Sequence, residues 1–372
     1  MSAFTHPIGL ERRGAAARTS LVVVALVGLG LPLDALSAQA ADATSAPTST
    51  GAPPPGSGPT GPGNPQAKPD LSAVTVEAPE PRFVAPTRRD RIGRIWVPVF
   101  INGKGPFRFA LDSCADSSAI TNRIAQALGL PLESTRHVLL HGSVGNAVVP
   151  TVPISSLDVG DLSIGRTELP VVPDAFGGAD GILATSRLVG RRLMIDFRHD
   201  LITITRSHGQ RAAEGFITIP FKVVRPELIV VDAYVGRVRA KAIIDTAGQG
   251  TTANAALRSA LERLRIEQNE ARIEDVTKTT MSADSAESPT IEIDAPESHK
   301  WIRITHDRMT FADMPIFRRW QLSGEPVLLI GMSALGQFDV MIIDYQLKEL
   351  QIRLSASAQT GFGLPFGLEP SP

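Results

Sequence analysis

The sequence contains a single cysteine, Cys114, among its 372 residues. One cysteine cannot form a disulfide within the chain, nor can it make the thiolate clusters that hold structural zinc or iron–sulfur centres. It also lies far beyond the N-terminal segment, so the chain has no lipid-acceptor cysteine directly after an export signal. We therefore expect no disulfide within the chain and no thiolate-bound metal centre; we also expect no other metal ion and no cofactor.

The chain has no excess of charge of either sign. Lys and Arg total 37, Asp and Glu total 38, and the formal net charge is −1. A protein that binds nucleic acid needs a basic surface to neutralise phosphates, so nucleic acid is not an expected partner. The hydrophobic content of 43% over 372 residues is enough to build the cores of two domains.

Long apolar runs are also absent. The apolar segment Leu21–Leu33 is well below the roughly 20 residues that span a bilayer. Arginines precede it and a small-residue pattern follows it, which together are typical of a cleaved export signal. We expect residues 1–40 to be a signal peptide of a periplasmic or secreted protein, the alternative being an uncleaved anchor. The pattern consists of Arg12, Arg13 and Arg18 before the apolar segment and Ala38-Gln39-Ala40 after it.

Composition then divides the rest of the chain. Residues 41–88 are dominated by Pro, Gly, Ser, Thr and Ala, which offer little to bury and predict a disordered linker. Beyond them we expect an N-terminal lobe over 89–206, a polar inter-lobe linker over 207–214 and a C-terminal lobe over 215–355. Residues 356–372 are expected to form a flexible tail.

The two expected lobes contain similar sequences. Residues 94–130 and 227–261 share one order: strand, tight turn, strand, Asp followed by Ser or Thr, polar loop and short helix. Asn102-Gly103 predicts a β-hairpin that leads into the Asp loop. After the loop, Ile120, Ile124 and Leu128 have helical spacing, and Gly129 predicts the end of the helix.

A second pair of similar segments closes each lobe. Residues 180–204 and 327–352 both run from an apolar strand through a short helix to Ile-Asp-Phe/Tyr, a turn and a last strand. Asp196 and Asp344 in these elements precede turns, so we expect them to accept hydrogen bonds within the hairpins rather than to act in catalysis. Two repeated elements in the same order predict an internal duplication and mainly β lobes.

With these motifs the sequence resembles the bacterial retropepsin-like aspartic proteases in their two-lobed, single-chain form. Asp112-Ser113 and Asp245-Thr246 match the family's Asp-Thr/Ser-Gly motif in its first two positions, and Leu329-Ile330-Gly331 matches its apolar-apolar-Gly element. Ile182-Leu183-Ala184 matches that element more loosely. The resemblance implies a mainly β, bilobal fold, a peptide or protein substrate and a site formed within a monomer.

The chemistry explains why two such loops are needed. Two carboxylates held close together cannot both ionise cheaply, so they share a proton: one activates a water molecule and the other donates to the peptide carbonyl. The resemblance assigns these roles to Asp112 and Asp245. Ser113 and Thr246 either brace the two loops against each other, as in the family resembled, or are ordinary turn residues.

Both loops depart from the family at the third motif position, which is glycine there. Cys114 and Ala247 occupy it here, and Gly248 follows one residue late. We expect their side chains to crowd the site or shift the loops, especially if the backbone needs positive φ. A nucleophilic role for Cys114 is disfavoured, because neighbouring carboxylates oppose a thiolate and no histidine is placed to activate it. Gly331 is expected to support the second loop.

The segment 137–150 is the candidate flap, a hairpin that closes over substrate, and the alternative is a simple surface hairpin. Its tip contains Gly142, Ser143 and Gly145. His137 and His141 form no convincing metal pair, because no third ligand has suitable spacing. The segments 141–145 and 331–336 both lack the nucleophile elbow of serine hydrolases.

Two functions remain open from the sequence. The first is an exported aspartic endopeptidase that uses Asp112 and Asp245. The second is a protein of the same fold that binds peptides or envelope material and has lost turnover through Cys114 and Ala247.

Overall fold

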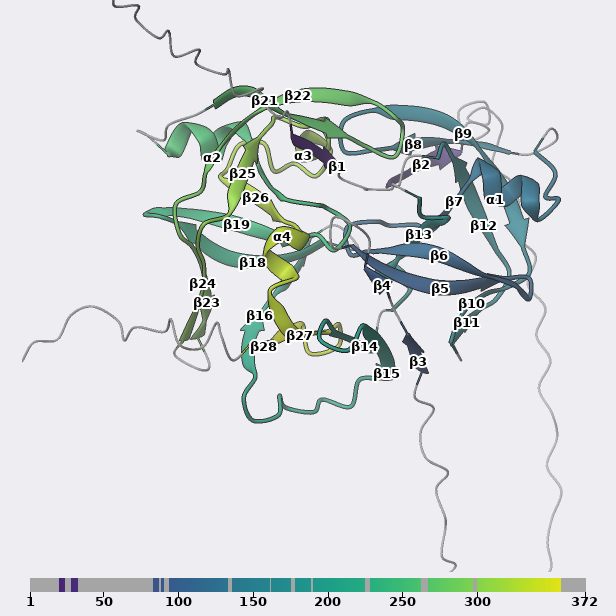
Figure 1. Cartoon of the computed structure of the whole chain (residues 1–372), viewed down its shortest axis with the longest axis horizontal. Helices are drawn as coiled ribbons and strands as arrows, with labels where there is room; N and C mark the ends of the chain where they lie inside the picture. Colours follow the sequence, from purple (N-terminus) through teal and green to yellow (C-terminus); the bar gives the residue numbers. More distant parts are fainter. Residues whose placement is uncertain are drawn as a thin grey trace, which may run out of the picture. The chain divides into compact units, whose positions relative to one another are not determined.

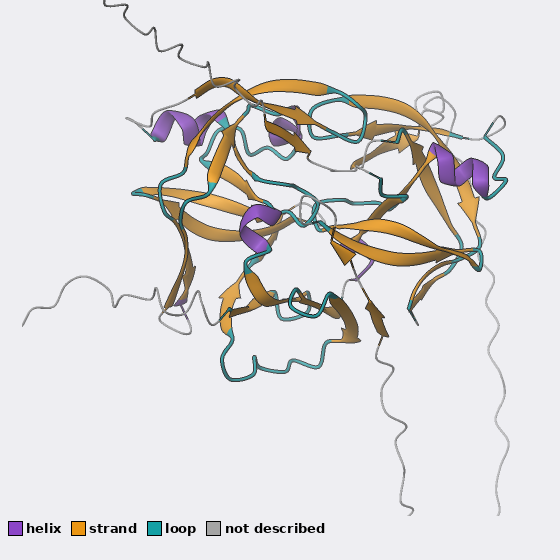
Figure 2. Cartoon of the chain, viewed as in Figure 1, coloured by secondary structure: helices purple, strands orange, loops and turns teal. Residues whose placement is uncertain are grey.

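The computed structural model describes residues 20–23, 28–32, 83–86, 88–89, 94–132, 136–160, 162–174, 178–188, 190–224, 228–261, 267–296 and 300–355. Contacts along the chain separate residues 34–81 from the rest, and that unit lies entirely outside the described residues. Most of the expected signal peptide, most of the expected linker and the tail over 356–372 also lie outside them. The described part is mainly β, with a few short helices between the strands (Figure 2).

One eleven-stranded sheet, here called the N-terminal sheet, carries the first Asp loop. Its path is β11-β10-β5-β6-β13-β7-β12-β9-β8-β2, and β4 pairs with β5 (Figure 1). Its strands are β2 (Gly28–Pro32), β4 (Arg88–Arg89), β5 (Ile95–Ile101), β6 (Lys104–Asp112), β7 (Ala119–Thr121), β8 (His137–His141), β9 (Asn146–Ile154), β10 (Leu157–Val159), β11 (Leu162–Ile164), β12 (Thr167–Val172) and β13 (Gly181–Ala184).

A second eleven-stranded sheet, the C-terminal sheet, carries the other Asp loop. Its path is β1-β21-β22-β25-β20-β26-β19-β18-β23-β24, and β17 pairs with β18. The run β21-β22-β25-β20-β26-β19-β18 has the same order and chain connections as β8-β9-β12-β7-β13-β6-β5. Its strands are β1 (Ser20–Val23), β17 (Lys222–Val224), β18 (Leu228–Val235), β19 (Val238–Ile244), β20 (Thr251–Ala253), β21 (Glu267–Glu274), β22 (Thr280–Glu287), β23 (Ile291–Ala295), β24 (Lys300–Ile304), β25 (Arg308–Phe311) and β26 (Val327–Ile330).

A six-stranded sheet joins the closing elements of the two halves. β14 pairs with β27 antiparallel at its centre, and the order is β16-β28-β27-β14-β15-β3. Part of the segment 41–88, expected as linker, is therefore ordered: β3 adds to the edge strand β15, and Arg88–Arg89 pairs with β5. The strands are β3 (Phe83–Pro86), β14 (Arg191–Asp196), β15 (Leu201–Arg206), β16 (Ile217–Pro220), β27 (Phe338–Asp344) and β28 (Glu349–Leu354).

The described helices are short. They are α1 (Asn122–Ala127), the 3-10 helix η2 (Thr185–Leu188), α2 (Ala255–Ala260), α3 (Pro315–Arg319) and α4 (Met332–Leu335). The helix predicted from Ile120 starts only at Asn122, because Ile120 pairs with Gly181 and Val171 as part of β7. Gly129 follows the helix with φ +67°, as predicted for its end. Among the described residues, no helix combines the length and apolarity needed to cross a membrane.

The hairpin before the first Asp loop shows how the sequence specifies these strands. In β5, Ile95, Val97, Val99 and Ile101 are buried and alternate with more exposed residues, as one face of a sheet requires. Asn102 and Gly103 both have positive φ, the conformation of the two-residue turn that their sequence predicts. The end of β6 is buried continuously from Phe109 onward, so the strand delivers Asp112 into the interior.

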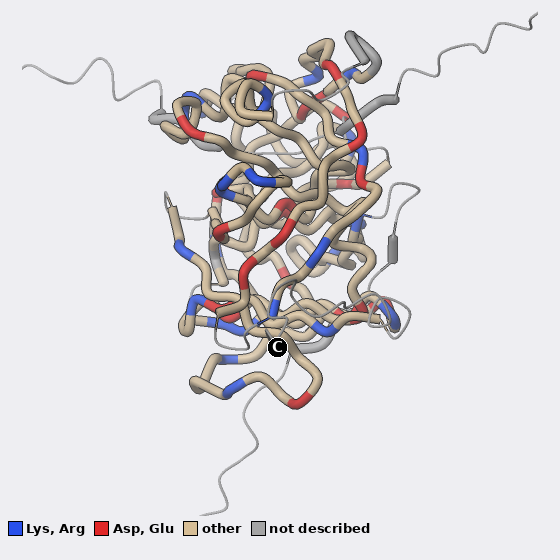
Figure 3. Tube along the Cα trace, turned by 90° about the vertical axis from the view of Figure 1, so that its left-hand side faces the viewer, with Lys and Arg blue, Asp and Glu red and all other residues tan. Residues whose placement is uncertain are grey.

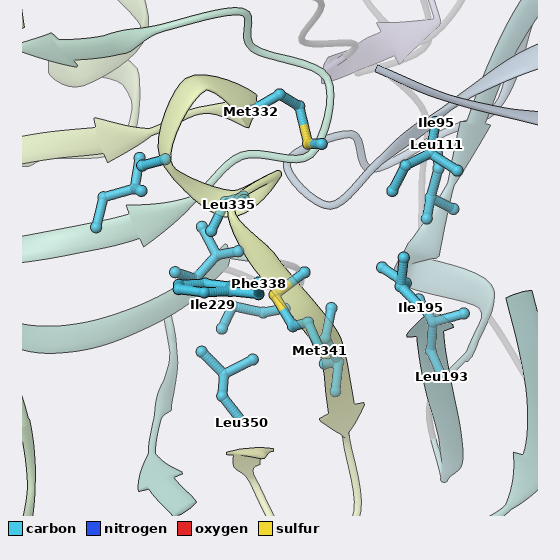
Figure 4. Close-up of a cluster of buried hydrophobic side chains, with 14 of the residues drawn as sticks. Ile95, Leu111, Leu193, Ile195, Ile229, Met332, Leu335, Phe338, Met341 and Leu350 are labelled. Carbon is cyan, nitrogen blue, oxygen red and sulfur yellow. The ribbon is translucent and has the colours of Figure 1, made fainter. Parts of the chain in front are cut away.

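Apolar side chains from all three sheets share one cluster. Figure 4 shows Leu193 and Ile195 of β14 near Ile95 and Leu111, and Phe338 of β27 near Ile229 and Leu335. The strands that end in the Asp loops are thus anchored to the six-stranded sheet below them by buried apolar contact. Along the described trace, acidic and basic residues are interspersed, in keeping with the balanced charge (Figure 3).

Candidate active site

The two motif aspartates lie at corresponding places in the two large sheets. Asp112 is the last residue of β6, which pairs with β13, and Asp245 follows β19, which pairs with β26. Both pairings are parallel. Asp112 is 0% exposed and Asp245 is 1% exposed, so both carboxyl groups are removed from bulk water.

Backbone N–H groups hold each carboxyl group in the same way. The N–H groups of Cys114 and Ala115 donate to Oδ1 of Asp112, at 2.8 and 3.0 Å. Those of Ala247 and Gly248 donate to Oδ1 of Asp245, at 3.0 and 2.8 Å. The third motif position therefore keeps its N–H directed at the carboxyl group although neither loop has glycine there. Oδ2 of Asp112 is buried and has no hydrogen-bond partner among the described residues.

The two loops bring the carboxyl groups together. One carboxyl oxygen of Asp112, one carboxyl oxygen of Asp245 and Sγ of Cys114 all lie within 4.8 Å of one another. Burial, and then the charge of Asp245, raise the pKa of Asp112 well above its usual range. Burial also raises the pKa of Asp245, to about 6, whereas its N–H partners and the positive charge of Arg94 oppose the rise. Both shifts favour retention of a proton by the pair in weakly acidic solution.

Ser113 and Thr246 form four buried hydrogen bonds between the loops. Oγ of Ser113 donates to the carbonyl oxygen of Ile244 at 2.7 Å and accepts from the Thr246 N–H at 3.1 Å. Oγ1 of Thr246 donates to the carbonyl oxygen of Leu111 at 2.8 Å and accepts from the Ser113 N–H at 3.0 Å. This reciprocal arrangement has the geometry of a brace. A pair of local turn contacts would instead stay within each loop.

Cys114 and Ala247 do not shift the loops away from the arrangement in which their N–H groups reach the carboxyl groups. Neither residue has positive φ, so neither backbone position requires glycine. Their side chains fill apolar space instead: Cys114 belongs to a cluster made mainly by the C-terminal sheet, and Ala247 to one made mainly by the N-terminal sheet. The Cys114 thiol also donates to the Ile244 carbonyl oxygen at 3.3 Å. Burial and the neighbouring carboxylates raise the pKa of this thiol well above its usual range, which disfavours a nucleophilic thiolate.

Gly331 allows close packing behind the second loop. A Cβ atom at this position would overlap the backbone carbonyl of Gly250. The Met332 N–H that follows donates to the carbonyl oxygen of Gly248 at 2.8 Å. In the N-terminal sheet, Ala184 stands at the end of β13, and its N–H donates to Oγ of Ser118 at 3.0 Å. The apolar-apolar-Gly element thus contacts its Asp loop directly.

The candidate flap forms the β-hairpin β8–β9. Its tip contacts a second hairpin, β21–β22, which was not predicted from the sequence. Asp275, at the tip of β21–β22, accepts hydrogen bonds from the N–H groups of Val144 and Gly145, at 2.8 and 2.7 Å (Figure 1). Gly142 and Gly145 pack so closely that a Cβ atom on either would overlap the second hairpin. Asp275 is 1% exposed, so this contact is buried.

The hairpin tips also exchange apolar side chains. Val144 lies in the cluster formed mainly by the C-terminal sheet, together with Cys114 and Met314. Val276 lies in the cluster formed mainly by the N-terminal sheet, together with Ala247. A signal for the second hairpin was present, since Gly142 and Asp275 each come 30 residues after the aspartate of their own half.

Two other groups of candidate residues lie elsewhere. Asp196 and Asp344 each accept two backbone N–H groups of the turn that follows, at 3.0–3.1 Å, as predicted. His141 contacts Asn146 through Nδ1 at 2.6 Å. His137 and His141 are part of no group of three metal-binding side chains among the described residues. The hydrogen bonds cited here join Asp196, Asp344 and His141 to their own turns or hairpin and to neither motif aspartate.

Comparison with known proteins supports the relationship that the motifs indicated. Residues 97–186 match the family model described as aspartyl protease, which places the match on the N-terminal sheet and the first Asp loop and covers less than half of the chain. No curated protein matches the chain. This part of the chain is therefore similar to aspartyl proteases, which supports a protease function. For that family the substrate is a peptide, and catalysis needs no metal.

Proposed function

We propose that the protein is an exported aspartic endopeptidase that hydrolyses peptide bonds with a water molecule activated between Asp112 and Asp245. The observation that carries the proposal is the approach of two buried carboxyl groups, each held by two N–H groups of its own loop. Two such groups can share one proton, which supplies a base and an acid in a single site.

The electrostatics favour one division of roles. Burial raises the pKa of both carboxyl groups, but the positive charge of Arg94 opposes the rise at Asp245, so we assign the role of base to Asp245 and the shared proton to Asp112. A water molecule attacks the peptide carbonyl carbon and gives a proton to Asp245, while Asp112 gives its proton to the carbonyl oxygen. The tetrahedral intermediate then collapses: Asp245 returns the proton to the leaving amine nitrogen, and Asp112 recovers a proton from the hydroxyl. No covalent bond to the protein forms.

The sheet edges support binding of the substrate as an extended strand. β1 pairs in parallel with β21, and β2 pairs antiparallel with β8. These two edges belong to the hairpins whose tips meet at Asp275. The hairpins β8–β9 and β21–β22 have matching chain connectivity. A single peptide that pairs with both β8 and β21 must therefore run parallel to one of these strands and antiparallel to the other. The chain's own N-terminal strands have this combination, and a peptide substrate could adopt it by strand addition.

A second candidate function is peptide binding without turnover. Sγ of Cys114 lies within 4.8 Å of both carboxyl groups, where the family resembled has no side chain. A sulfur atom there restricts the space for water. This reading predicts that peptides bind and are never cleaved, at any acidity.

Digestion of a diverse peptide library separates the two functions. The full chain should yield new peptide ends over the range from acid to neutral pH, and the Asp245→Asn variant should yield none. Binding of library peptides without any cleavage by the unsubstituted chain would support the second function. Export is tested separately: residues 1–40 fused to a reporter that is active only outside the cytoplasm should restore its activity.

A further inference from the structure

Three potential metal ligands meet at the centre of the site. Asp112, Cys114 and Asp245 each offer one ligand atom, and these atoms lie within 4.8 Å of one another. Among the described residues, no other group of three His, Cys, Asp or Glu side chains has this spacing. All three residues are buried, at 0%, 6% and 1% exposure.

The donor set suits a thiophilic divalent cation. One thiolate and two carboxylates are donors that Zn²⁺ accepts, and a site with three protein ligands leaves the fourth position to water. Zn–S and Zn–O bonds of about 2.3 and 2.1 Å place tetrahedral ligands about 3.5 Å apart, so side-chain rotations of roughly 1 Å would close the site. Hard cations such as Mg²⁺ would gain nothing from the sulfur.

One of these ligands also has free coordination capacity. Oδ2 of Asp112 is fully buried and has no hydrogen-bond partner among the described residues. A buried carboxyl oxygen without a partner is costly, and a cation bound there would satisfy it. This observation is independent of the spacing of the three ligands.

We propose that Asp112, Cys114 and Asp245 form an inhibitory site for a thiophilic divalent cation, with Zn²⁺ as the probe of the class. The bound cation would occupy the place of the attacking water and hold both carboxyl groups as anions, so neither could serve as acid. Binding releases the Cys114 thiol proton from its hydrogen bond to the Ile244 carbonyl oxygen and the shared carboxyl proton to solvent. The inhibitory consequence rests on the proposed function, whereas the binding does not.

Ala247 indicates a control variant that removes only the sulfur ligand. It stands at the third motif position of the second loop, with the same N–H contact and an equally apolar setting. Alanine is therefore compatible with this position, and Cys114→Ala should fold while removing only the thiolate ligand. All three ligand residues are nearly fully buried, so binding should be slow.

The experiment is a titration of the full chain with Co²⁺ and then with Zn²⁺ at neutral pH. Co²⁺ bound by a thiolate gives a charge-transfer absorption band, and with one cysteine in the chain the band can come only from Cys114. We expect this band, its loss on addition of Zn²⁺, and its absence in Cys114→Ala, with Zn²⁺ affinity lower by about tenfold or more. His141→Gln, a surface control, should keep the band. Circular dichroism should show that both variants are folded.

The outcomes distinguish this inference from the proposed function. Absence of the band in the unsubstituted chain, or equal Zn²⁺ affinity in Cys114→Ala, would overturn the site. If the band appears and peptides are cleaved, Zn²⁺ should inhibit cleavage by the unsubstituted chain at concentrations that leave Cys114→Ala active; equal inhibition of both would overturn the inhibitory role. If the band appears and no peptide is ever cleaved, the metal site stands and the endopeptidase proposal fails.

Discussion

Replacement of Thr246 by valine tests whether the hydroxyl groups between the two Asp loops hold the site together. Valine has nearly the shape of threonine and lacks only the hydroxyl group. In the native protein this hydroxyl donates to the Leu111 carbonyl oxygen at 2.8 Å and accepts from the Ser113 N–H at 3.0 Å. Thr246→Val leaves both partners buried without these contacts, because Leu111 and Ser113 are 1% and 0% exposed.

The expected loss of stability follows from those two groups. Each buried polar group left without its partner costs about 1–3 kcal/mol, so Thr246→Val should lower the free energy of unfolding by about 2–6 kcal/mol. The carboxyl groups should also lose their relative placement, so peptide cleavage should fall more than substrate binding.

Thr252→Val is the matched control. Thr252 is also fully buried in the C-terminal sheet, but its hydroxyl has no hydrogen-bond partner among the described residues. The same chemical change there should be neutral or slightly stabilising. Urea denaturation of the three proteins, followed by fluorescence and circular dichroism, measures the difference. A Thr246→Val protein no less stable than Thr252→Val would refute the bracing role.

Three further predictions concern the same region. Burial raises the folded-state pKa of Asp245 to about 6, above the ordinary 3.8 of an aspartate, so the stability that its protonation contributes is lost as the pH rises between these values. Urea denaturation against pH should show stability falling over this range in the unsubstituted chain and a flatter slope in Asp245→Asn, and an unchanged slope would contradict the raised pKa. Asp275→Ala removes a carboxylate that accepts the N–H groups of Val144 and Gly145. These two amides should then exchange with deuterium about tenfold faster or more, and unchanged protection would refute the contact between the hairpin tips. Cys114→Gly removes a side chain packed in an apolar cluster and should lower the free energy of unfolding, measured by urea denaturation, by about 1–3 kcal/mol. We expect no gain in peptide cleavage, and a more active variant would show that the sulfur obstructs the site.

Local patterns were enough to predict the elements that carry the carboxyl groups. The Asn102-Gly103 turn and the hydrogen bonds of Asp196 and Asp344 depend on residues close in sequence, and the structure confirms each of them. The start of α1 was predicted too early, because Ile120 gains more from pairing in the sheet than from a helical turn. Tertiary pairing overrides local spacing in such short elements.

Contacts between distant segments could not be predicted in the same way. Whether Cys114 crowds the carboxyl groups depends on the apolar space that the C-terminal sheet offers, and no local pattern specifies that space. The hydrogen bonds that Asp275 accepts from the β8–β9 tip join residues about 130 positions apart. The similarity of the two halves would have been enough to predict Asp275 at a hairpin tip. Its hydrogen bonds with the β8–β9 tip, however, follow only from the packing of the two halves.

The most direct test of the account is the cleavage of one peptide substrate, chosen from the library, by matched aspartate variants. Asp112→Asn and Asp245→Asn should each lower kcat by about a thousandfold or more while the folded fraction stays unchanged. Asp196→Asn, which alters contacts of Asp196 with Arg198 and His199 in its own turn of the six-stranded sheet, should retain most of the activity. Cleavage that survives in Asp112→Asn or Asp245→Asn would contradict the assignment of the two carboxyl groups.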